Sequence, residues 1–150
     1  MNESQKPIII GCDHAAFALK ERIKTYLIDQ AGLRVEDVGT FDESSVDYPD
    51  FGVKVAEAVS EGRFDRGILI CGTGIGMSMV ANRFPRVRAA LCNDLFSAKM
   101  SKLHNNANIL VLGGRVIGDI LAQEIVDTWL ETAFEGGRHQ ARLEKFDSIG

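Results

Sequence analysis

Five short apolar runs recur along the chain, and each is followed by a segment in which apolar residues return every three or four positions. The runs are predicted strands at residues 7–12, 33–38, 66–71, 87–92 and 108–112. The amphipathic segments are predicted helices at residues 15–31, 49–62, 77–82, 94–104, 118–133 and 138–147. Runs that are apolar on both sides are typical of parallel strands covered on both faces. The alternation therefore predicts a three-layer, doubly wound α/β sandwich around a five-stranded parallel sheet.

The same spacing predicts which helix positions face the core and how the chain is divided. The expected buried residues are Phe17, Leu19, Ile23, Leu27, Val53, Ala56, Val59, Phe96, Met100, Leu103, Ala122, Ile125, Val126, Trp129, Leu130 and Ala133. We expect residues 7–150 to form a single domain. The polar residues 1–6 are expected to be a disordered extension.

Composition and charge exclude several classes of protein. The 150 residues carry a formal net charge of −4, so there is no basic excess with which to replace phosphate counterions, and we expect no nucleic-acid partner. No apolar run approaches the roughly 20 residues that span a bilayer, and residues 1–6 have no signal-peptide core, so we expect no membrane. Three cysteines without C-x-x-C spacing indicate reduced thiols in the cytoplasm and no zinc site.

The strongest chemical signal follows the third predicted strand. An apolar run ends at Cys71, and Gly72, Gly74 and Gly76 follow at alternate positions before the next helix begins. Glycines allow backbone amides to approach a ligand closely, and amides at a helix start favour an anion. A cysteine beside that positive end would have its thiolate stabilised. A reactive thiol beside an oxyanion cradle indicates an active site.

Other polar residues stand at the ends of predicted elements. Ligands in such a sheet bind beyond the carboxyl ends of the strands. The candidates are Asp13 and His14 after the first strand, Asn93 and Asp94 after the fourth, Arg115 after the fifth, and His104 and Asn105 at the end of the fourth helix. Arg138 and Arg142 share one helix face and could clamp a phosphate, although such a pair is more often a solvated face.

Most of these side chains also have a structural interpretation. Cys12 and Cys92 lie in apolar runs and are expected to be packing residues. His104 could simply stabilise the negative end of a helix. His14 could be an ordinary loop histidine, and His139 is expected to be exposed or structural. Residue types alone leave these alternatives open.

Three other chemistries fit less well. A dinucleotide site would need G-x-G-x-x-G near the first strand, and here the glycines follow the third strand with the spacing G-x-G-x-G. A cysteine phosphatase would need an arginine within the glycine loop, which has none before Arg83. A metal-dependent isomerase would need clustered carboxylates and histidines, and the sequence shows no such cluster. We therefore expect no metal and no cofactor. The remaining set suits proton abstraction beside a carbonyl in a small phosphorylated molecule.

Several motifs together resemble the type B ribose-5-phosphate isomerases, a family that includes galactose- and allose-6-phosphate isomerases. The motifs are Gly11-Cys12-Asp13-His14-Ala15, Asp47-Tyr48-Pro49, Ile70-Cys71-Gly72-Thr73-Gly74-Ile75-Gly76, His104-Asn105 and Glu135-Gly136-Gly137-Arg138-His139. The resemblance covers residues 8 to about 146. It implies a flavodoxin-like or Rossmann-like fold, and a homodimer or dimer of dimers whose active sites use both chains.

The resemblance also implies roles for individual residues in a metal-free exchange of ribose 5-phosphate and ribulose 5-phosphate. Cys71 is implied to be the base that moves a proton between C1 and C2, and His104 to assist ring opening. Some relatives carry a glutamate where this chain has Met77, which cannot take a proton. The implied substrate contacts are Asp13, Tyr48, Asn105, the amides of Gly72, Thr73, Gly74, Ile75, Gly76, Met77 and Ser78, and the phosphate ligands His14, Arg115, Arg138 and Arg142.

Two alternatives to this function remain at the level of sequence. The substrate could be a six-carbon sugar phosphate, because pocket depth is not encoded in motif spacing. The chain could also be a non-catalytic module that binds sugar phosphates, which would keep the arginines and the glycine loop but would not need Cys71.

Overall fold

The computed structural model describes residues 6–149 and alternates five strands with six α-helices. The strands are β1 (Ile8–Cys12), β2 (Val35–Asp37), β3 (Gly67–Cys71), β4 (Ala89–Leu91) and β5 (Ile109–Gly113). The α-helices are α1 (Phe17–Asp29), α2 (Tyr48–Ser60), α3 (Ile75–Ala81), α4 (Leu95–Leu103), α5 (Asp119–Glu131) and α6 (Arg138–Asp147). A short 3₁₀ turn, His14–Ala16, precedes α1.

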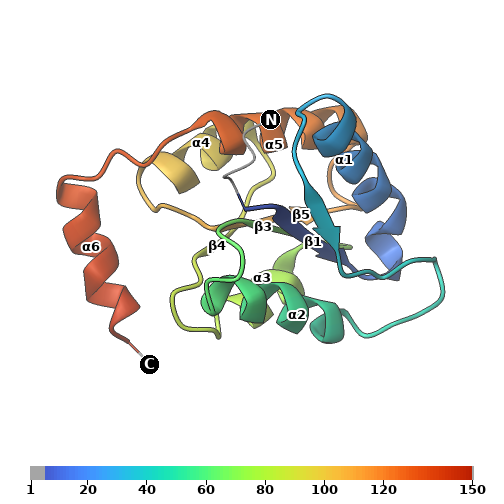
Figure 1. Cartoon of the computed structure of the whole chain (residues 1–150), viewed down its shortest axis with the longest axis horizontal. Helices are drawn as coiled ribbons and strands as arrows, with labels where there is room; N and C mark the ends of the chain where they lie inside the picture. The colour runs from blue at the N-terminus through green and yellow to red at the C-terminus, as the bar shows by residue number, and fades with distance from the viewer. Residues whose placement is uncertain (1–5, 150) are drawn as a thin grey trace.

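All five strands are parallel, in the order β2-β1-β3-β5-β4. The sheet lies between two helical layers, with α1, α4 and α5 on one side and α2 and α3 on the other (Figure 1). This arrangement confirms the predicted parallel α/β sandwich. The chain leaves β1 toward β2 in one direction and returns to β3 on the other side of β1, so the order of connection reverses between β1 and β3. A crevice at such a reversal is where ligands bind in open parallel sheets.

The core has two parts, one on each face of the sheet. Apolar residues of α1, α4 and α5, with Trp129 fully buried, pack on one face. Apolar residues of α2 and α3, including the fully buried Met77, pack on the other. β1, β3 and β5 are buried along their whole length, which explains why they are continuous apolar runs and do not alternate.

Three predicted core positions are wrong. Phe96 is 72% exposed, because α4 buries Ala98 and Ser101 and a residue two positions away points to the opposite side of a helix. Val53 is 37% exposed and lies beside the buried row of α2, which includes Gly52, Val55 and Ala56. Ala133 lies beyond the end of α5 and is exposed.

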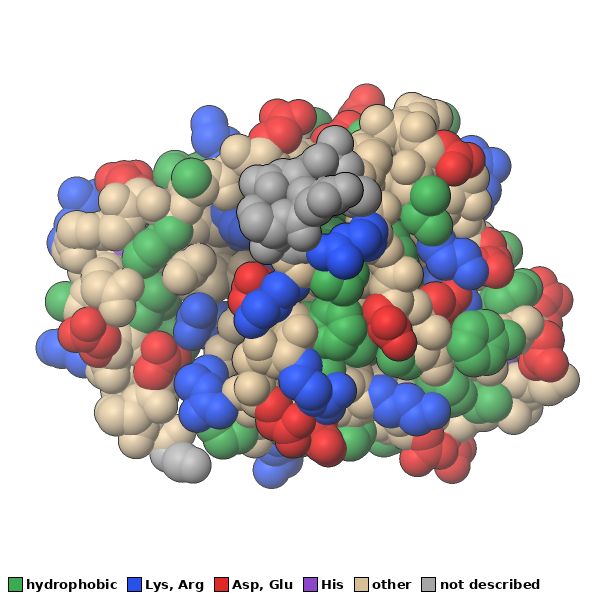
Figure 2. Space-filling model, viewed as in Figure 1, with side chains coloured by type: hydrophobic (Ala, Val, Ile, Leu, Met, Phe, Trp, Pro, Cys, Tyr) green, Lys and Arg blue, Asp and Glu red, His purple; other side chains and the backbone are tan. Residues whose placement is uncertain are grey.

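Helix α6 lies apart from the two helical layers, beyond the β4 end of the sheet (Figure 1). It is joined to that edge by an ion pair between Arg88 and Asp147, whose Nη1 and Oδ2 atoms are 3.5 Å apart. Lys and Arg side chains are interspersed with acidic and apolar ones on the face shown in Figure 2. No helix among residues 6–149 is long and apolar enough to cross a membrane. Of the extension predicted at 1–6, residues 1–5 lie outside the described residues, and Lys6 Nζ donates to the Gly62 carbonyl.

Candidate active site

The carboxyl ends of β1, β3 and β5 bring several predicted site residues together. Asp13 follows β1, Cys71 ends β3, and Arg115 follows β5, so all three lie at one edge of the sheet. We call this edge, with the glycine turn 72–78, His14 and Tyr48, the carboxyl-edge group. The Gly114 amide donates to the Cys71 carbonyl at 2.8 Å, and the Arg115 amide donates to Gly72 at 2.9 Å. These bonds fix the turn after β3 to the turn after β5.

The Cys71 sulfur lies beneath the glycine turn, at the margin of the buried cluster that packs against α2 and α3. The residue is 5% exposed, and the Gly74 amide donates to its Sγ at 3.2 Å. Gly74 has a φ of +82°, and a Cβ there would meet the Leu112 carbonyl at 3.2 Å, so glycine is required for the turn to close over the sulfur. The α3 helix begins at the next residue, and the first amides of a helix have no acceptor within it. The sulfur therefore accepts from one amide donor, which would stabilise a negative charge on it.

The other two cysteines belong to the core on the opposite face of the sheet from Cys71. Burial raises the pKa of Cys12 to about 12 and the pKa of Cys92 to about 11. Both belong to the core beneath α1, α4 and α5, as predicted for packing residues. Their thiols are protonated at neutral pH and are poor nucleophiles.

Tyr48 and Arg115 lie against the glycine turn. A Cβ placed on Gly76 would overlap the Tyr48 ring, so the phenol rests directly on the turn backbone. The Arg115 side chain lies over Gly72, where an added Cβ would be 3.6 Å from the arginine Cδ. A hydroxyl and a guanidinium thus border the turn that holds the sulfur. The Met77 side chain is fully buried in the core, so only its backbone is available to a ligand.

His14 and Asp13 are held by the backbone around them. The Val46 amide donates to His14 Nδ1 at 3.1 Å, so the neutral ring carries its proton on Nε2. Asp13 is buried, and its Oδ1 accepts from the Ala15 amide at 3.1 Å. These contacts orient a histidine N–H and a carboxylate at the end of β1.

A buried ion pair supports the loop between β2 and α2, which carries Val46 and leads into Tyr48 at the start of α2. Lys20 is fully buried on α1, and its Nζ donates to Asp37 Oδ2 and to the Thr40 carbonyl, each at 2.7 Å. Lys24 Nζ also donates to Asp37, at 2.9 Å. Burial alone would raise the pKa of Asp37, but the two lysines and the Gly39 amide lower it overall. Sequence analysis did not identify this network, although Lys20 occupies a position within the apolar stripe of α1.

The remaining predicted site residues lie at the opposite edge. His104 caps the end of α4, and the chain then enters β5 through Asn108, whose carbonyl accepts from Gly67 at the start of β3. Gly67 and Cys71 are the two ends of β3, and four residue steps at 3.3 Å put the edges roughly 13 Å apart. The His104 side chain and the Cys71 sulfur of one chain are therefore on different edges of the sheet.

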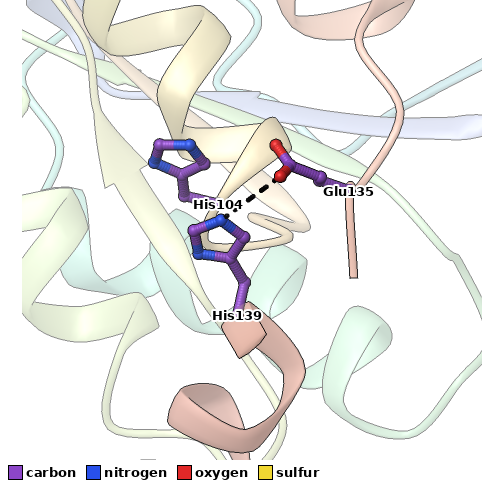
Figure 3. Close-up of side chains that lie close together, drawn as sticks. All are labelled: His104, Glu135 and His139. Carbon is purple, nitrogen blue, oxygen red and sulfur yellow. Dashed lines mark ion pairs between the residues drawn. The ribbon is translucent and has the colours of Figure 1, made fainter. Parts of the chain in front are cut away.

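His104 is accompanied by residues of the α6 segment (Figure 3). The ring of His139 stacks on that of His104, with centroids 4.2 Å apart and planes inclined by 13°. His139 is 4% exposed, and its Nε2 lies 3.7 Å from Glu135 Oε1. Burial and the neighbouring charges of His104 and Arg138 lower the pKa of His139. Sequence analysis left His139 as exposed or structural and did not weigh Glu135; their spacing of four residues was the available signal.

Arg138 and Arg142 belong to the same side as His104. Both are exposed on α6, whose first turn is placed by the His139 stack. Asn105 lines a cavity of about 490 Å³ between the β4 edge and Phe146 near the end of α6. We call His104, Asn105, Arg138 and Arg142 the amino-edge group. The predicted phosphate ligands are thus divided, with His14 and Arg115 at one edge and the two α6 arginines at the other.

Comparison with known proteins decides the family. Residues 8–146 match the model of the ribose/galactose isomerase family. The chain belongs to this family. It is 47% identical to ribose-5-phosphate isomerase B of Escherichia coli over 96% of each protein. It is 46% identical to D-erythrulose-4-phosphate isomerase of Pectobacterium atrosepticum, over 92% of this chain and 91% of that protein.

Comparison with solved structures indicates the same family as comparison of the sequences. Ribose-5-phosphate isomerase B of Clostridium thermocellum is 54% identical, with a TM-score of 0.93 over 95% of this chain and 96% of that one. The protein is therefore an isomerase, and the non-catalytic binding module considered from sequence is set aside.

Proposed function

We propose that this isomerase interconverts D-ribose 5-phosphate and D-ribulose 5-phosphate through an enediolate, without a metal. In this mechanism Cys71 is the base that removes the carbon-bound proton. The observation that carries the proposal is the Cys71 sulfur, 3.2 Å from the Gly74 amide at the start of α3. The backbone amides of the glycine turn would hold the negative enediolate oxygen, which is the charge that forms in the transition state.

The proposed site is completed by a second copy of the chain. The carboxyl-edge group supplies the thiol, and the amino-edge group of the partner would supply His104 and Asn105. Apolar side chains border the carboxyl-edge group on the segments after β3, β4 and β5, where they are exposed in the single chain. They are Ile75, Met79, Leu95, Phe96, Val116 and Ile120. An apolar surface of this kind on neighbouring strand ends is typical of a protein interface, which supports a homodimer or a dimer of dimers.

The proton and phosphate chemistry follows from this assembly. Ribose 5-phosphate is mostly a closed ring, and a histidine such as His104 can deliver a proton to the ring oxygen near neutral pH. The phosphate would be held by His14 and Arg115 from one chain and by Arg138 and Arg142 from the other. Binding energy from this remote group can orient the sugar carbons against the sulfur. We place the reaction in the cytoplasm, since all three cysteines are free thiols.

The substrate is tested by an isomerisation assay on the purified protein. D-ribose 5-phosphate, D-allose 6-phosphate and D-galactose 6-phosphate are compared at equal concentrations, with D-erythrulose 4-phosphate included because of the Pectobacterium relative. The proposal expects the highest kcat/KM for ribose 5-phosphate. A higher kcat/KM for a six-carbon substrate would favour the alternative that the sequence leaves open, and turnover of none of these compounds would contradict the proposal.

A further inference from the structure

Three potential metal ligands meet at the amino edge of the sheet. One nitrogen of His104, one nitrogen of His139 and one carboxylate oxygen of Glu135 all lie within 4.8 Å of one another. They come from the end of α4, the start of α6 and the segment just before α6, and they face each other in Figure 3. The proposed isomerisation uses only His104 of these three side chains.

The Nε2 atom of His139 gives an independent reason to look for a ligand. His139 is 4% exposed, and within residues 6–149 its Nε2 is buried without a hydrogen-bond partner. The nearest carboxylate oxygen, Glu135 Oε1, is 3.7 Å away, which is too far for a hydrogen bond. A buried polar atom without a partner is unfavourable and uncommon in folded proteins. A ring nitrogen with a free lone pair is also a good ligand for a transition metal.

We propose that His104, His139 and Glu135 form a binding site for a divalent transition metal such as Zn²⁺. Two imidazoles and one carboxylate are a recurrent three-ligand set for zinc, with the fourth position left open. Imidazole nitrogen also favours zinc and copper over magnesium and calcium, which prefer oxygen. Arg138 and Arg142 are positive neighbours of the site, so only a metal with strong intrinsic affinity for nitrogen is expected to bind.

Bonding geometry requires the three side chains to approach one another and the two rings to reorient. Zinc–nitrogen bonds of about 2.0–2.1 Å in a tetrahedron put ligand atoms roughly 3.4 Å apart, so separations of up to 4.8 Å must shrink by as much as about 1.4 Å. The Glu135 side chain is 48% exposed and is free to rotate toward the rings. The ring stack must also open from its inclination of 13°, so that the two nitrogen lone pairs converge. Gly136 and Gly137 lie between Glu135 and His139, where glycine permits such adjustment.

Bound metal would make the site inhibitory, a consequence that rests on the proposed function. The metal would occupy the lone pair with which His104 exchanges a proton during ring opening. Zn²⁺ is therefore expected to inhibit isomerisation reversibly, and a chelator is expected to restore it. Within one chain the site lies roughly a strand length from Cys71, but the proposed dimer would bring the thiol of the other copy close to His104. Whether the thiol takes part in metal binding is therefore tested by substitution.

The test uses the full-length purified protein with Co²⁺ as a spectroscopic probe and Zn²⁺ in calorimetry. Tetrahedral Co²⁺ bound to imidazole absorbs in the visible region, whatever the activity of the enzyme. The proposal expects the Co²⁺ bands to disappear, and the Zn²⁺ affinity to fall by at least about tenfold, in both His139→Gln and Glu135→Gln. Glu135→Gln alters a half-exposed side chain and preserves its shape, so it keeps the test valid if His139→Gln folds poorly.

Two control variants identify the ligands. His14→Gln removes the one histidine outside the cluster, and Cys71→Ser removes the thiol; both are expected to keep the Co²⁺ bands. The proposal is overturned if wild type shows no Co²⁺ bands, if Glu135→Gln binds as wild type does, or if Cys71→Ser abolishes the bands. Metal bound through Glu135 and His139 without loss of activity would support the site and count against the proposed role of His104.

Discussion

Cys71 and His104 lie at opposite edges of the same sheet, separated by the length of β3 and β5. Helix α4 runs back from the carboxyl edge to the amino edge of the sheet. A residue at the end of α4 therefore cannot face the carboxyl ends of the strands. The carboxyl edge holds Cys71 together with Asp13, His14, Tyr48 and Arg115. The amino edge holds His104 together with the two arginines of α6. A single chain therefore presents two incomplete groups, and the proposed chemistry requires two copies that exchange them.

Removing the Cys71 thiol tests the proposed base. We expect Cys71→Ala to lower kcat by about 10²–10⁴-fold, the usual contribution of a positioned acid or base, with little change in KM. Steady-state kinetics measure both constants, and a binding titration with ribose 5-phosphate confirms that the site is still formed. Cys92→Ala is the matched control, since Cys92 is buried in the core away from the turn. Near-normal kcat in Cys71→Ala would refute the assignment.

The rate of alkylation measures the reactivity of each of the three thiols. With the pKa of Cys12 at about 12 and the pKa of Cys92 at about 11, both are protonated near pH 7.5 and should react slowly with iodoacetamide. Cys71 is the most exposed of the three, its sulfur accepts from the Gly74 amide, and it should be modified first. Ribose 5-phosphate should protect it. Peptide mass spectrometry over a time course assigns the order. Equal rates for the three cysteines, or no protection, would indicate that Cys71 is an ordinary packing residue.

The phosphate role of α6 is tested at Arg138. Loss of a charge-assisted bond to phosphate is worth about 1.5–3 kcal/mol, so Arg138→Ala should raise KM roughly 10- to 100-fold with a smaller effect on kcat. Arg83→Ala, which removes an exposed arginine after α3, serves as the control for loss of charge. An unchanged KM in Arg138→Ala would support the alternative that Arg138 and Arg142 form a solvated helix face.

The Lys20–Asp37 pair predicts an acid-dependent loss of stability. Because the pKa of Asp37 is lowered in the folded protein, its ion pairs contribute fully above the unfolded value, near 3.8. That contribution is lost as the pH falls through 3.8 toward the lower folded value. Asp37→Asn should cost roughly 3–5 kcal/mol at pH 7, because the fully buried Lys20 loses its counter-charge.

Urea unfolding of wild type and Asp37→Asn between pH 7 and pH 3 measures this difference. The gap in the free energy of unfolding should narrow below pH 4, where Asp37 becomes protonated in the unfolded chain. Glu36→Gln, a change at an exposed carboxylate next to Asp37, should show little gap at any pH. A gap that stays constant down to pH 3 would mean that the charge of Asp37 does not contribute.

The pattern of apolar residues predicted the architecture because both faces of this sheet are buried. Continuous apolar runs gave β1, β3 and β5, and the helical period gave the long helices with ends differing by a few residues. The pattern was wrong for Phe96, because an exposed apolar residue and a core residue look alike in sequence. The prediction for Val53 failed for a similar reason. Val53 lies beside the buried face of α2, and the helical period of apolar residues does not determine how wide that face is.

The positions of candidate site residues were predictable only where those residues directly follow a predicted strand. Cys71 with its glycines, Asp13, His14 and Arg115 were identified because carboxyl ends of parallel strands share one edge. The contact of His139 with His104 depends on how the segment 132–137 brings α6 back to the end of α4, which no local pattern encodes. Lys20 was missed because a charged residue within an apolar stripe becomes interpretable only when its partner, Asp37, is seen beside it.

Subunit complementation tests the central claim most directly. Cys71→Ala and His104→Gln are each prepared alone, where each is expected to be inactive, and are then co-expressed with different affinity tags so that mixed dimers can be purified. If the site takes Cys71 from one chain and His104 from the other, the mixed dimer contains one intact site. It should have about half of the wild-type kcat, and a random mixture of all dimers about one quarter. A mixed dimer as inactive as its two parents would contradict the account.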